Sequence, residues 1–262
     1  MESKKVFYGW YVLAGLCIVY AASNGIITLS LKRFYPVLIG EFGWTRDEVT
    51  RPVSIFYLSL AVLMPIIGSM LDRGNPKRIL LIGSAICVLG LVAFGRIGSL
   101  THFILVYIFL AIGLAGAGIA ASMFILTKWF HRHRGKAVGI LLVGGSLGGA
   151  LFNKITGDAI DGMGWQNATL LLAGLGALFM FIPAILLVKN KPADMGLFPD
   201  GDSSAPLSET IGGLSLKEAF KTPVLYIVFL ATGILWFCII GTQQHQDIYL
   251  QNELGIDSSI VT

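Results

Sequence analysis

Charged residues are scarce in this sequence. Asp, Glu, Lys and Arg make up only 13% of the 262 residues, against roughly a quarter in soluble globular domains. A soluble protein could not cover its surface with so few charges, and the shortage also excludes a disordered chain or a nucleic-acid-binding protein. Cysteine is scarce too. Cys17, Cys87 and Cys238 each lie in an apolar run, which excludes a disulfide-stapled secreted protein and predicts small packing residues and no metal site.

Long apolar runs take the place of charge. Hydrophobic residues make up 55% of the chain, and 32 glycines stand against 9 prolines, as is typical of helices that pack closely in lipid. A helix crosses a bilayer with about 20 uncharged residues, and barrel strands would alternate polar and apolar residues, which these runs do not. We therefore predict an all-α membrane protein in contact with the lipid bilayer. Seven spans are expected, at residues 9–31, 52–71, 79–95, 103–127, 137–153, 168–188 and 222–244.

The basic residues predict an orientation. With the N-terminus inside, 13 of the 19 Lys and Arg residues fall in the inner segments and six fall outside. Basic residues are retained on the cytoplasmic side of a membrane. We therefore expect a multi-pass protein of the inner (plasma) membrane with a cytoplasmic N-terminus. The net charge of +4 then reflects sidedness and indicates no nucleic-acid partner.

The spacing of the spans divides the chain into three parts. Residues 1–188 form a predicted N-terminal bundle of six helices joined by short connections. Residues 189–221 are rich in proline, glycine and polar residues, so they are interpreted as a cytoplasmic linker. Residues 222–262 hold one more helix, which we interpret as the start of a truncated C-terminal bundle.

A glycine, an Asp-Arg pair and further basic residues share the loop between the second and third spans. Glycine would let two helices approach closely, the aspartate could face a helix N-terminus or an arginine, and the basic residues would hold the turn at the headgroups. The loop resembles the loop motif of the major facilitator superfamily. Asn75 stands at the family's second glycine, and asparagine tolerates the left-handed conformation. The matching residues are Gly68, Asp72, Arg73, Lys77 and Arg78.

Other segments are similar to the monocarboxylate and oxalate:formate carrier branch of that superfamily. They include Phe7-Tyr8-Gly9-Trp10, Phe34-Tyr35-Pro36, Glu41-Phe42-Gly43-Trp44 and Phe198-Pro199-Asp200-Gly201. The resemblance implies a six-helix bundle of two three-helix inverted repeats, one half of a carrier that works by alternating access. It also implies that the main carboxylate-binding cations lie in the second half. Leu29 occupies the register of a lysine that some relatives carry on the first helix.

Glycines on the fourth and fifth spans predict close helix packing. Without Cβ atoms, two helix backbones can approach and shift against each other, in a moving or a static bundle. Residues 116–121 also satisfy G-x-G-x-x-A, but that dinucleotide fingerprint has meaning only between a strand and a helix, so no cofactor is expected. The helix-packing candidates are Gly113, Gly116, Gly118, Gly144, Gly145, Gly148 and Gly149.

Polar residues in or beside the spans are the candidates for a substrate path, because burying them in lipid is costly unless they line a cavity. A carboxylate substrate needs a cation and hydrogen-bond donors, which the outer half of the first span offers. The alternatives are snorkelling of the two cations to the headgroups, a local ion pair of Lys154 with Asp158, and a histidine that simply faces water. The candidates are Asn24, Thr28, Lys32, Arg33, Lys154 and His245.

Together these features predict a secondary active transporter for small organic anions, such as monocarboxylates or oxalate and formate, moved with a proton or against a counter-anion. The chain would be incomplete without further C-terminal helices or a partner chain that supplies them. No nucleophile, base and orienting group converge in any segment, so an enzyme is not expected. Two alternatives stay open. One is a non-transporting truncated membrane protein, and the other is a seven-helix receptor or retinal protein, although residues 222–244 hold no lysine for a Schiff base.

Overall fold

A computed structural model describes residues 7–202 and 216–248. The side chains of residues 216–217, 240–241 and 243–248 lie outside that description. The chain divides into two compact units, Met1–Leu207 and Ser208–Thr262, which are treated separately below.

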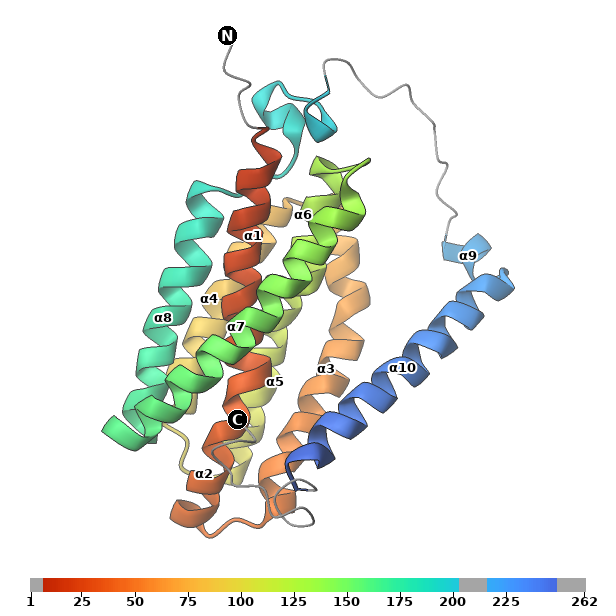
Figure 1. The fold of residues 1–262 in the computed structure, drawn as a ribbon. Coiled ribbons are helices and arrows are strands. Elements are labelled where there is room, and N and C mark those ends of the chain that lie inside the picture. Colours follow the sequence, from red (N-terminus) through yellow and green to blue (C-terminus); the bar gives the residue numbers. More distant parts are fainter. Residues whose placement is uncertain (1–6, 203–215, 249–262) are drawn as a thin grey trace. The chain divides into compact units, whose positions relative to one another are not determined.

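The first unit is a helical bundle (Figure 1). Within the described residues, six helical segments are long and apolar enough to cross a membrane. The first runs through four helix types, α1 (Gly9–Ser23), the π-helix η1 (Asn24–Ser30), the 3-10 helix η2 (Leu31–Phe34) and α2 (Tyr35–Phe42). The others are α3 (Arg46–Arg73), α4 (Pro76–Phe94), α5 with α6 (Leu100–Ala117 and Ile119–Trp129), α7 (Arg134–Met163) and α8 (Trp165–Leu186).

Short polar signals start and end these helices. Thr45 and Glu48 form a capping box at the start of α3, each side chain bonding the other's backbone N–H, which satisfies donors that the helix itself cannot use. Asn75 caps α4 by accepting the Arg78 N–H at 3.1 Å. Asn75 is extended, at φ −105°, so it does not take the left-handed conformation expected from the sequence. Asn75 has this conformation as the N-cap residue of α4, where its side chain accepts the Arg78 N–H.

Small residues decide which helices touch. The α4 backbone approaches α5 at Gly83, where a Cβ would lie 2.5 Å from the Ala117 nitrogen and 2.7 Å from the Gly113 oxygen. The α1–η1 segment packs along α7 and α8, and α5 lies against both α3 and α4. One apolar core surrounds Phe34, Phe94 and Tyr107. A second core surrounds Trp129 and Phe130 at the end where α1 begins.

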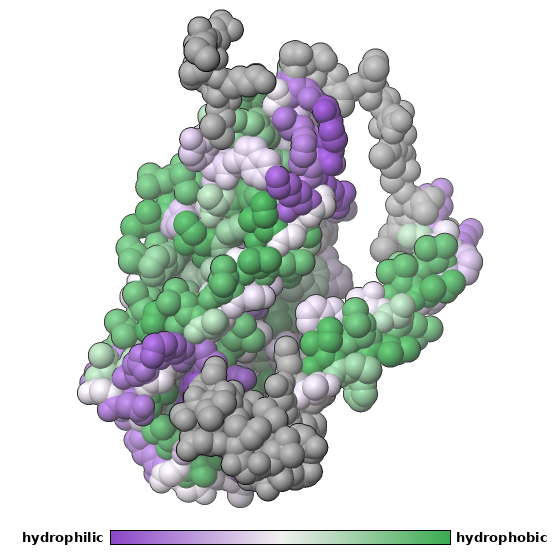
Figure 2. All heavy atoms as spheres, in the orientation of Figure 1, coloured by the Kyte–Doolittle hydropathy of each residue, from purple (hydrophilic) through white to green (hydrophobic). Residues whose placement is uncertain are grey.

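Apolar side chains also cover the outside of this unit. Figure 2 shows green side chains along the middle of the bundle and purple ones near both ends. On α3, the exposed residues Leu58, Val62, Ile66 and Met70 repeat every four positions and form one apolar stripe. An apolar belt between polar ends is the surface expected of a protein embedded in lipid.

The predicted spans agree with these helices, and their ends differ. The first was expected to end at residue 31 but continues to Phe42. The fourth is divided at Gly118, which has φ −84° and ψ −155° and separates α5 from α6. Gly118 therefore interrupts the helix, whereas the sequence suggested a packing residue within a continuous span.

Residues after α8 are partly helical. The 3-10 helices η3 (Pro192–Met195) and η4 (Pro199–Gly201) follow α8, and η4 contacts both α1 and α6. In the second unit, α9 spans Leu216–Ala219, and α10 spans Pro223–Ile248 and covers residues 223–244 of the seventh predicted span. Its apolar part, Pro223–Ile239, is shorter than the six candidate spans of the first unit.

Candidate functional site

The second half of the first span contains an uncommon helix type. Residues Asn24–Ser30 form a π-helix, and the Ser30 hydroxyl donates to the Gly25 carbonyl oxygen at 2.7 Å. A π-helix is wider than an α-helix and occurs frequently at functional sites. It fits here because Gly25 lies against the backbone of Gly148 on α7, where a side chain would collide. The π-helix contains two of the predicted substrate-path residues, Asn24 and Thr28.

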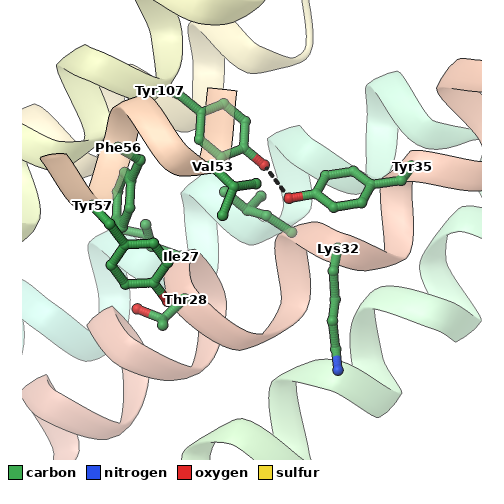
Figure 3. Close-up of a pocket in the computed structure, with 9 residues that line it drawn as sticks. Ile27, Thr28, Lys32, Tyr35, Val53, Phe56, Tyr57 and Tyr107 are labelled. Carbon is green, nitrogen blue, oxygen red and sulfur yellow. Dashed lines mark hydrogen bonds between the residues drawn. The ribbon is translucent and has the colours of Figure 1, made fainter. Parts of the chain in front are cut away.

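Thr28 borders a small polar pocket between η1, α3 and α5 (Figure 3). The pocket has a volume of about 20 Å³, room for roughly one water-sized group. The Thr28 hydroxyl oxygen is buried and has no hydrogen-bond partner among the described residues, which is costly for a polar atom unless a ligand or solvent completes it. The pocket is lined by Ile27, Thr28, Leu31, Lys32, Tyr35, Val53, Phe56, Tyr57 and Tyr107.

Two tyrosines fix one wall of this pocket. The hydroxyl groups of Tyr35, at the start of α2, and Tyr107, on α5, lie 2.9 Å apart and share a hydrogen bond. Tyr107 is held edge-on against the buried ring of Phe103, with ring centroids 5.0 Å apart. Because one hydroxyl of the pair donates and the other accepts, the pair keeps hydrogen-bonding capacity to offer a ligand.

The predicted cations occupy different surroundings. Lys32 lines the pocket and is exposed. The Arg33 Nε donates to Asn153 Oδ1 on α7 at 2.7 Å, so its guanidinium is oriented by a neighbouring helix. Lys154 pairs with Asp158 at 3.4 Å, and both side chains are strongly exposed. Thr28 and Lys32 therefore both border the pocket, with the Lys32 amino group directed away from the Thr28 hydroxyl (Figure 3). Lys154 lies in a surface ion pair.

The residues of the loop motif lie at the opposite end of the bundle. Arg73 and Arg78 line a cavity of about 460 Å³ between the end of α3 and the start of α4. Lys77 donates to the Ile185 carbonyl at 2.8 Å, at the C-terminus of α8, where a cation is favourable. Asp72 is exposed and has no ion pair within the described residues. No described atom lies within 4 Å of a Cβ built at Gly68, so the expected close helix approach is absent from the described part.

The glycines of α7 contact the first span. A Cβ at Gly144 would meet Cys17, one at Gly145 would meet the Tyr20 ring, and one at Gly149 would meet Leu29. Gly148 faces the Ala21 backbone. On the other helix pair, Gly113 and Gly116 of α5 lie against α4. His245 falls in α10, but its side chain lies outside the described residues.

Several residues of this region were missed by sequence reasoning. Tyr107 and Tyr57 look like ordinary apolar positions of their spans, and Asn153 looks like a helix end. Tyr35 was noted only for its family resemblance. The one available signal was the Asn24-Gly25 pair inside an apolar run, which is unusual for a regular span.

Comparison with known proteins identifies the family. The sequence profile of the Major Facilitator Superfamily matches residues 8–262. The chain belongs to the Major Facilitator Superfamily. Its fold is similar to that of a bacterial homologue of the human lysosomal transporter Spinster, a structure solved in an inward-facing conformation. The TM-score is 0.70, with 20% identity, and the match covers 98% of this chain and 58% of that one.

The relatives of this chain within the superfamily are named for different substrates or roles. A probable hexose phosphate transport protein of Chlamydia muridarum is 27% identical over 77% of this chain and 46% of its own length. Monocarboxylate transporter 11 of Mus musculus is 29% identical over 86% of this chain and 49% of its own length. The membrane sensor protein UhpC of Salmonella typhimurium is 24% identical over 85% of this chain and 52% of its own length. The chain spans about half the length of these relatives.

Proposed function

We propose that this chain is the N-terminal half of a secondary active transporter for small organic anions, working by alternating access. The observation that carries the proposal is the buried Thr28 hydroxyl, unpartnered among the described residues, in a pocket that Lys32 also lines. A hydroxyl can donate a hydrogen bond to a carboxylate or phosphate oxygen, and such bonds to an ionised group are stronger than neutral ones. The names of two relatives, a hexose phosphate transport protein and a monocarboxylate transporter, share this chemistry.

The pocket is large enough for one oxygen of an anionic group and too small for a whole substrate. Its volume of about 20 Å³ holds one oxygen-sized group, so the rest of the substrate would lie outside it. In this proposal, helices of the second bundle supply the opposite wall. They would come from further C-terminal residues or from a partner chain. The proposal places the protein in the inner membrane with a cytoplasmic N-terminus, and allows symport with a proton or exchange against a counter-anion.

Equilibrium binding to the purified chain tests the proposal. We expect saturable binding of lactate, oxalate or glucose 6-phosphate, and no binding of glucose or glycerol at the same concentration. Lys32→Gln should weaken binding about tenfold to a hundredfold, because a hydrogen bond to a charged group contributes roughly 1.5–3 kcal/mol. Lys154→Gln is the matched control, since Lys154 is not among the residues that line the pocket, and should leave affinity unchanged. Equal affinity for glucose, or equal effects of both variants, would contradict the proposal.

A sensor that binds without transporting is the second candidate. It is favoured by the similarity to the membrane sensor protein UhpC. A chain that binds an anion saturably, but shows no anion uptake in proteoliposomes even with a complete second bundle present, would favour the sensor over the transporter.

A further inference from the structure

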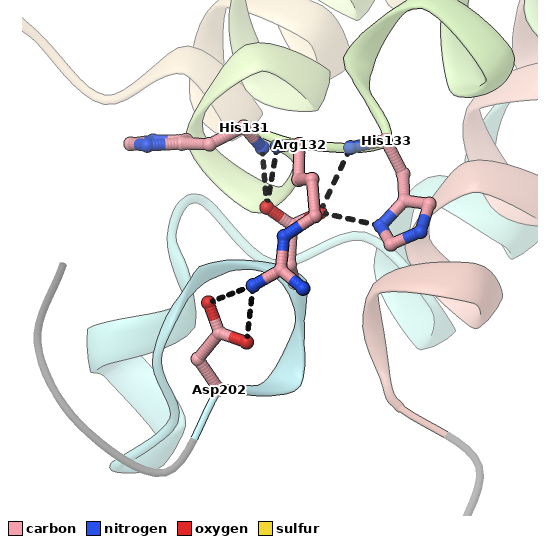
Figure 4. Close-up of polar contacts among 5 residues, drawn as sticks. His131, Arg132, His133 and Asp202 are labelled. Atoms are coloured by element: carbon pink, nitrogen blue, oxygen red, sulfur yellow. Dashed lines mark hydrogen bonds and ion pairs between the residues drawn. The ribbon is translucent and has the colours of Figure 1, made fainter.

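Two carboxylates that follow α8 bind the loop between α6 and α7 (Figure 4). Asp200 Oδ2 accepts the backbone N–H groups of His131 and Arg132 at 2.8 and 2.7 Å. Its Oδ1 accepts the His133 N–H at 3.3 Å and lies 3.2 Å from the His133 ring nitrogen. Both carboxylate oxygens of Asp202 accept from the single nitrogen Arg132 Nη2, at 3.0 Å each. The α6–α7 loop is therefore closed by contacts from a distant part of the chain.

The two carboxylates differ in burial. The Asp200 side chain is only 2% exposed, whereas Asp202 is 42% exposed and its partner Arg132 is 69% exposed. A carboxylate at the N-terminal end of a helix is favoured by the unpaired N–H groups there, and such charge-assisted bonds are strong when water is excluded. An exposed ion pair contributes little. Of the two carboxylates, Asp200 therefore contributes more to holding the α6–α7 loop than Asp202 does.

The backbone at Asp200 and Gly201 has positive φ angles. Asp200 has φ 57° and Gly201 has φ 77°, so the chain turns back sharply after Pro199. Gly201 packs on Phe7, whose ring lies against Trp129 and Phe130. Holding a non-glycine residue at positive φ costs about 1 kcal/mol or more, and the four contacts of the Asp200 carboxylate offset it.

Further contacts tie the same segment to other helix ends. The Tyr8 hydroxyl donates to the Leu187 carbonyl at 3.3 Å, and the Trp129 Nε1 donates to the Lys189 carbonyl at 3.0 Å. The Lys77 N–H donates to Asn190 Oδ1 at 2.8 Å. Residues 187–202 therefore reach the starts of α1, α4 and α7 and the end of α6.

We propose that residues 187–202 form a clasp, in which Asp200 is the positioning residue that fixes the start of α7 against α1. The contact of α7 with the first span is lined by glycines, so the two backbones lie close together there. The clasp adds hydrogen bonds at one end of this close contact. This inference does not depend on the substrate proposed above.

Residue-resolved hydrogen exchange on the full chain, without ligand, tests the clasp. Asp200→Gly removes the carboxylate and keeps positive φ free of strain. It should speed exchange of the amides of residues 131–133 about tenfold or more, and also speed exchange in the first turns of α7. Asp200→Asn keeps one acceptor oxygen, so we expect faster exchange at His133 and retained protection at His131 and Arg132. Asp202→Asn is the control and should change exchange less than about twofold, as for exposed pairs.

Exchange in α5 separates a local clasp from general loss of stability. Under the proposal, protection of residues 100–117 stays at the wild-type level in all three variants. Wild-type exchange at residues 131–133 in Asp200→Gly would overturn the proposal, as would an equal effect of Asp202→Asn. Faster exchange that rises equally in α5 would overturn it too, because it would show that Asp200 stabilises the whole fold and not the start of α7.

Discussion

Gly25 on η1 and Gly148 on α7 meet through their backbones. A Cβ at Gly25 would lie 2.6 Å from the Gly148 carbonyl oxygen, and Gly148 in turn faces the Ala21 backbone. This close approach makes room for the wider π-helix, and the π-helix contains Thr28. The glycine contact and the candidate anion pocket are therefore parts of one local structure.

Adding a single methyl group at this contact should destabilise the bundle. We expect Gly148→Ala to lower the free energy of unfolding by about 1–3 kcal/mol, the usual cost of overpacking, because α1 must move away. Gly157→Ala, also on α7, is the control. No atom lies within 4 Å of its Cβ position, so it should be neutral or stabilising by up to about 1 kcal/mol. Thermal denaturation in detergent measures both. A stable Gly148→Ala protein would show that the contact is looser than described.

Removing the Thr28 hydroxyl should lower anion affinity without lowering the stability of the fold. Thr28→Val replaces a buried oxygen that has no partner among the described residues, so Tm should stay equal or rise, while anion affinity falls about tenfold. Thr156→Val deletes a hydrogen bond of 2.6 Å to the Phe152 carbonyl, so it should lower the free energy of unfolding by about 1 kcal/mol and leave affinity unchanged. A lower Tm in Thr28→Val would mean that its hydroxyl already has a structural partner.

The contribution of Asp200 to stability should depend on pH. Burial alone would raise the pKa of Asp200, but the N–H groups of Arg132, His131 and His133 and the His133 ring outweigh it, so the pKa is lowered. A lowered pKa stabilises the folded protein above the unfolded value of about 3.9, and this contribution is lost as pH falls through the folded pKa. The Tm difference between wild type and Asp200→Asn should shrink as the pH falls below about 4. Loss of the difference near pH 6 would instead identify a histidine as the titrating group.

The proposed orientation can be tested with two single cysteines at opposite ends of the bundle. His131 is exposed in the α6–α7 loop and uses only its backbone N–H in the clasp. Gly162 is exposed near the end of α7. With Cys238, which is exposed, replaced by serine, a membrane-impermeant thiol reagent added to intact cells should label Gly162→Cys and not His131→Cys. Permeabilised cells should label both. The reverse pattern would place the N-terminus outside.

The sequence predicted the spans well because each needs only a long apolar run, whatever its neighbours. It did not predict the helix types inside the first span, since the π-helix depends on the contact of Gly25 with a helix about 120 residues away. Asp200 was noted only within a family motif, because its role needs a positive φ and three N–H groups from another loop. Thr28 was predicted as a candidate. The tyrosines that line the same pocket lie on other helices, so only the folded structure shows that they are near Thr28.

The central claim is that a small anion binds beside Thr28, and ligand protection of that position tests it most directly. In Thr28→Cys with Cys17→Ser and Cys238→Ser, a small thiol reagent should modify position 28. Lactate, oxalate or glucose 6-phosphate should slow that modification with the concentration dependence of anion binding measured on the same variant. Glucose should not slow it. Labelling of position 28 that is unchanged at a saturating concentration of every bound anion would contradict the account.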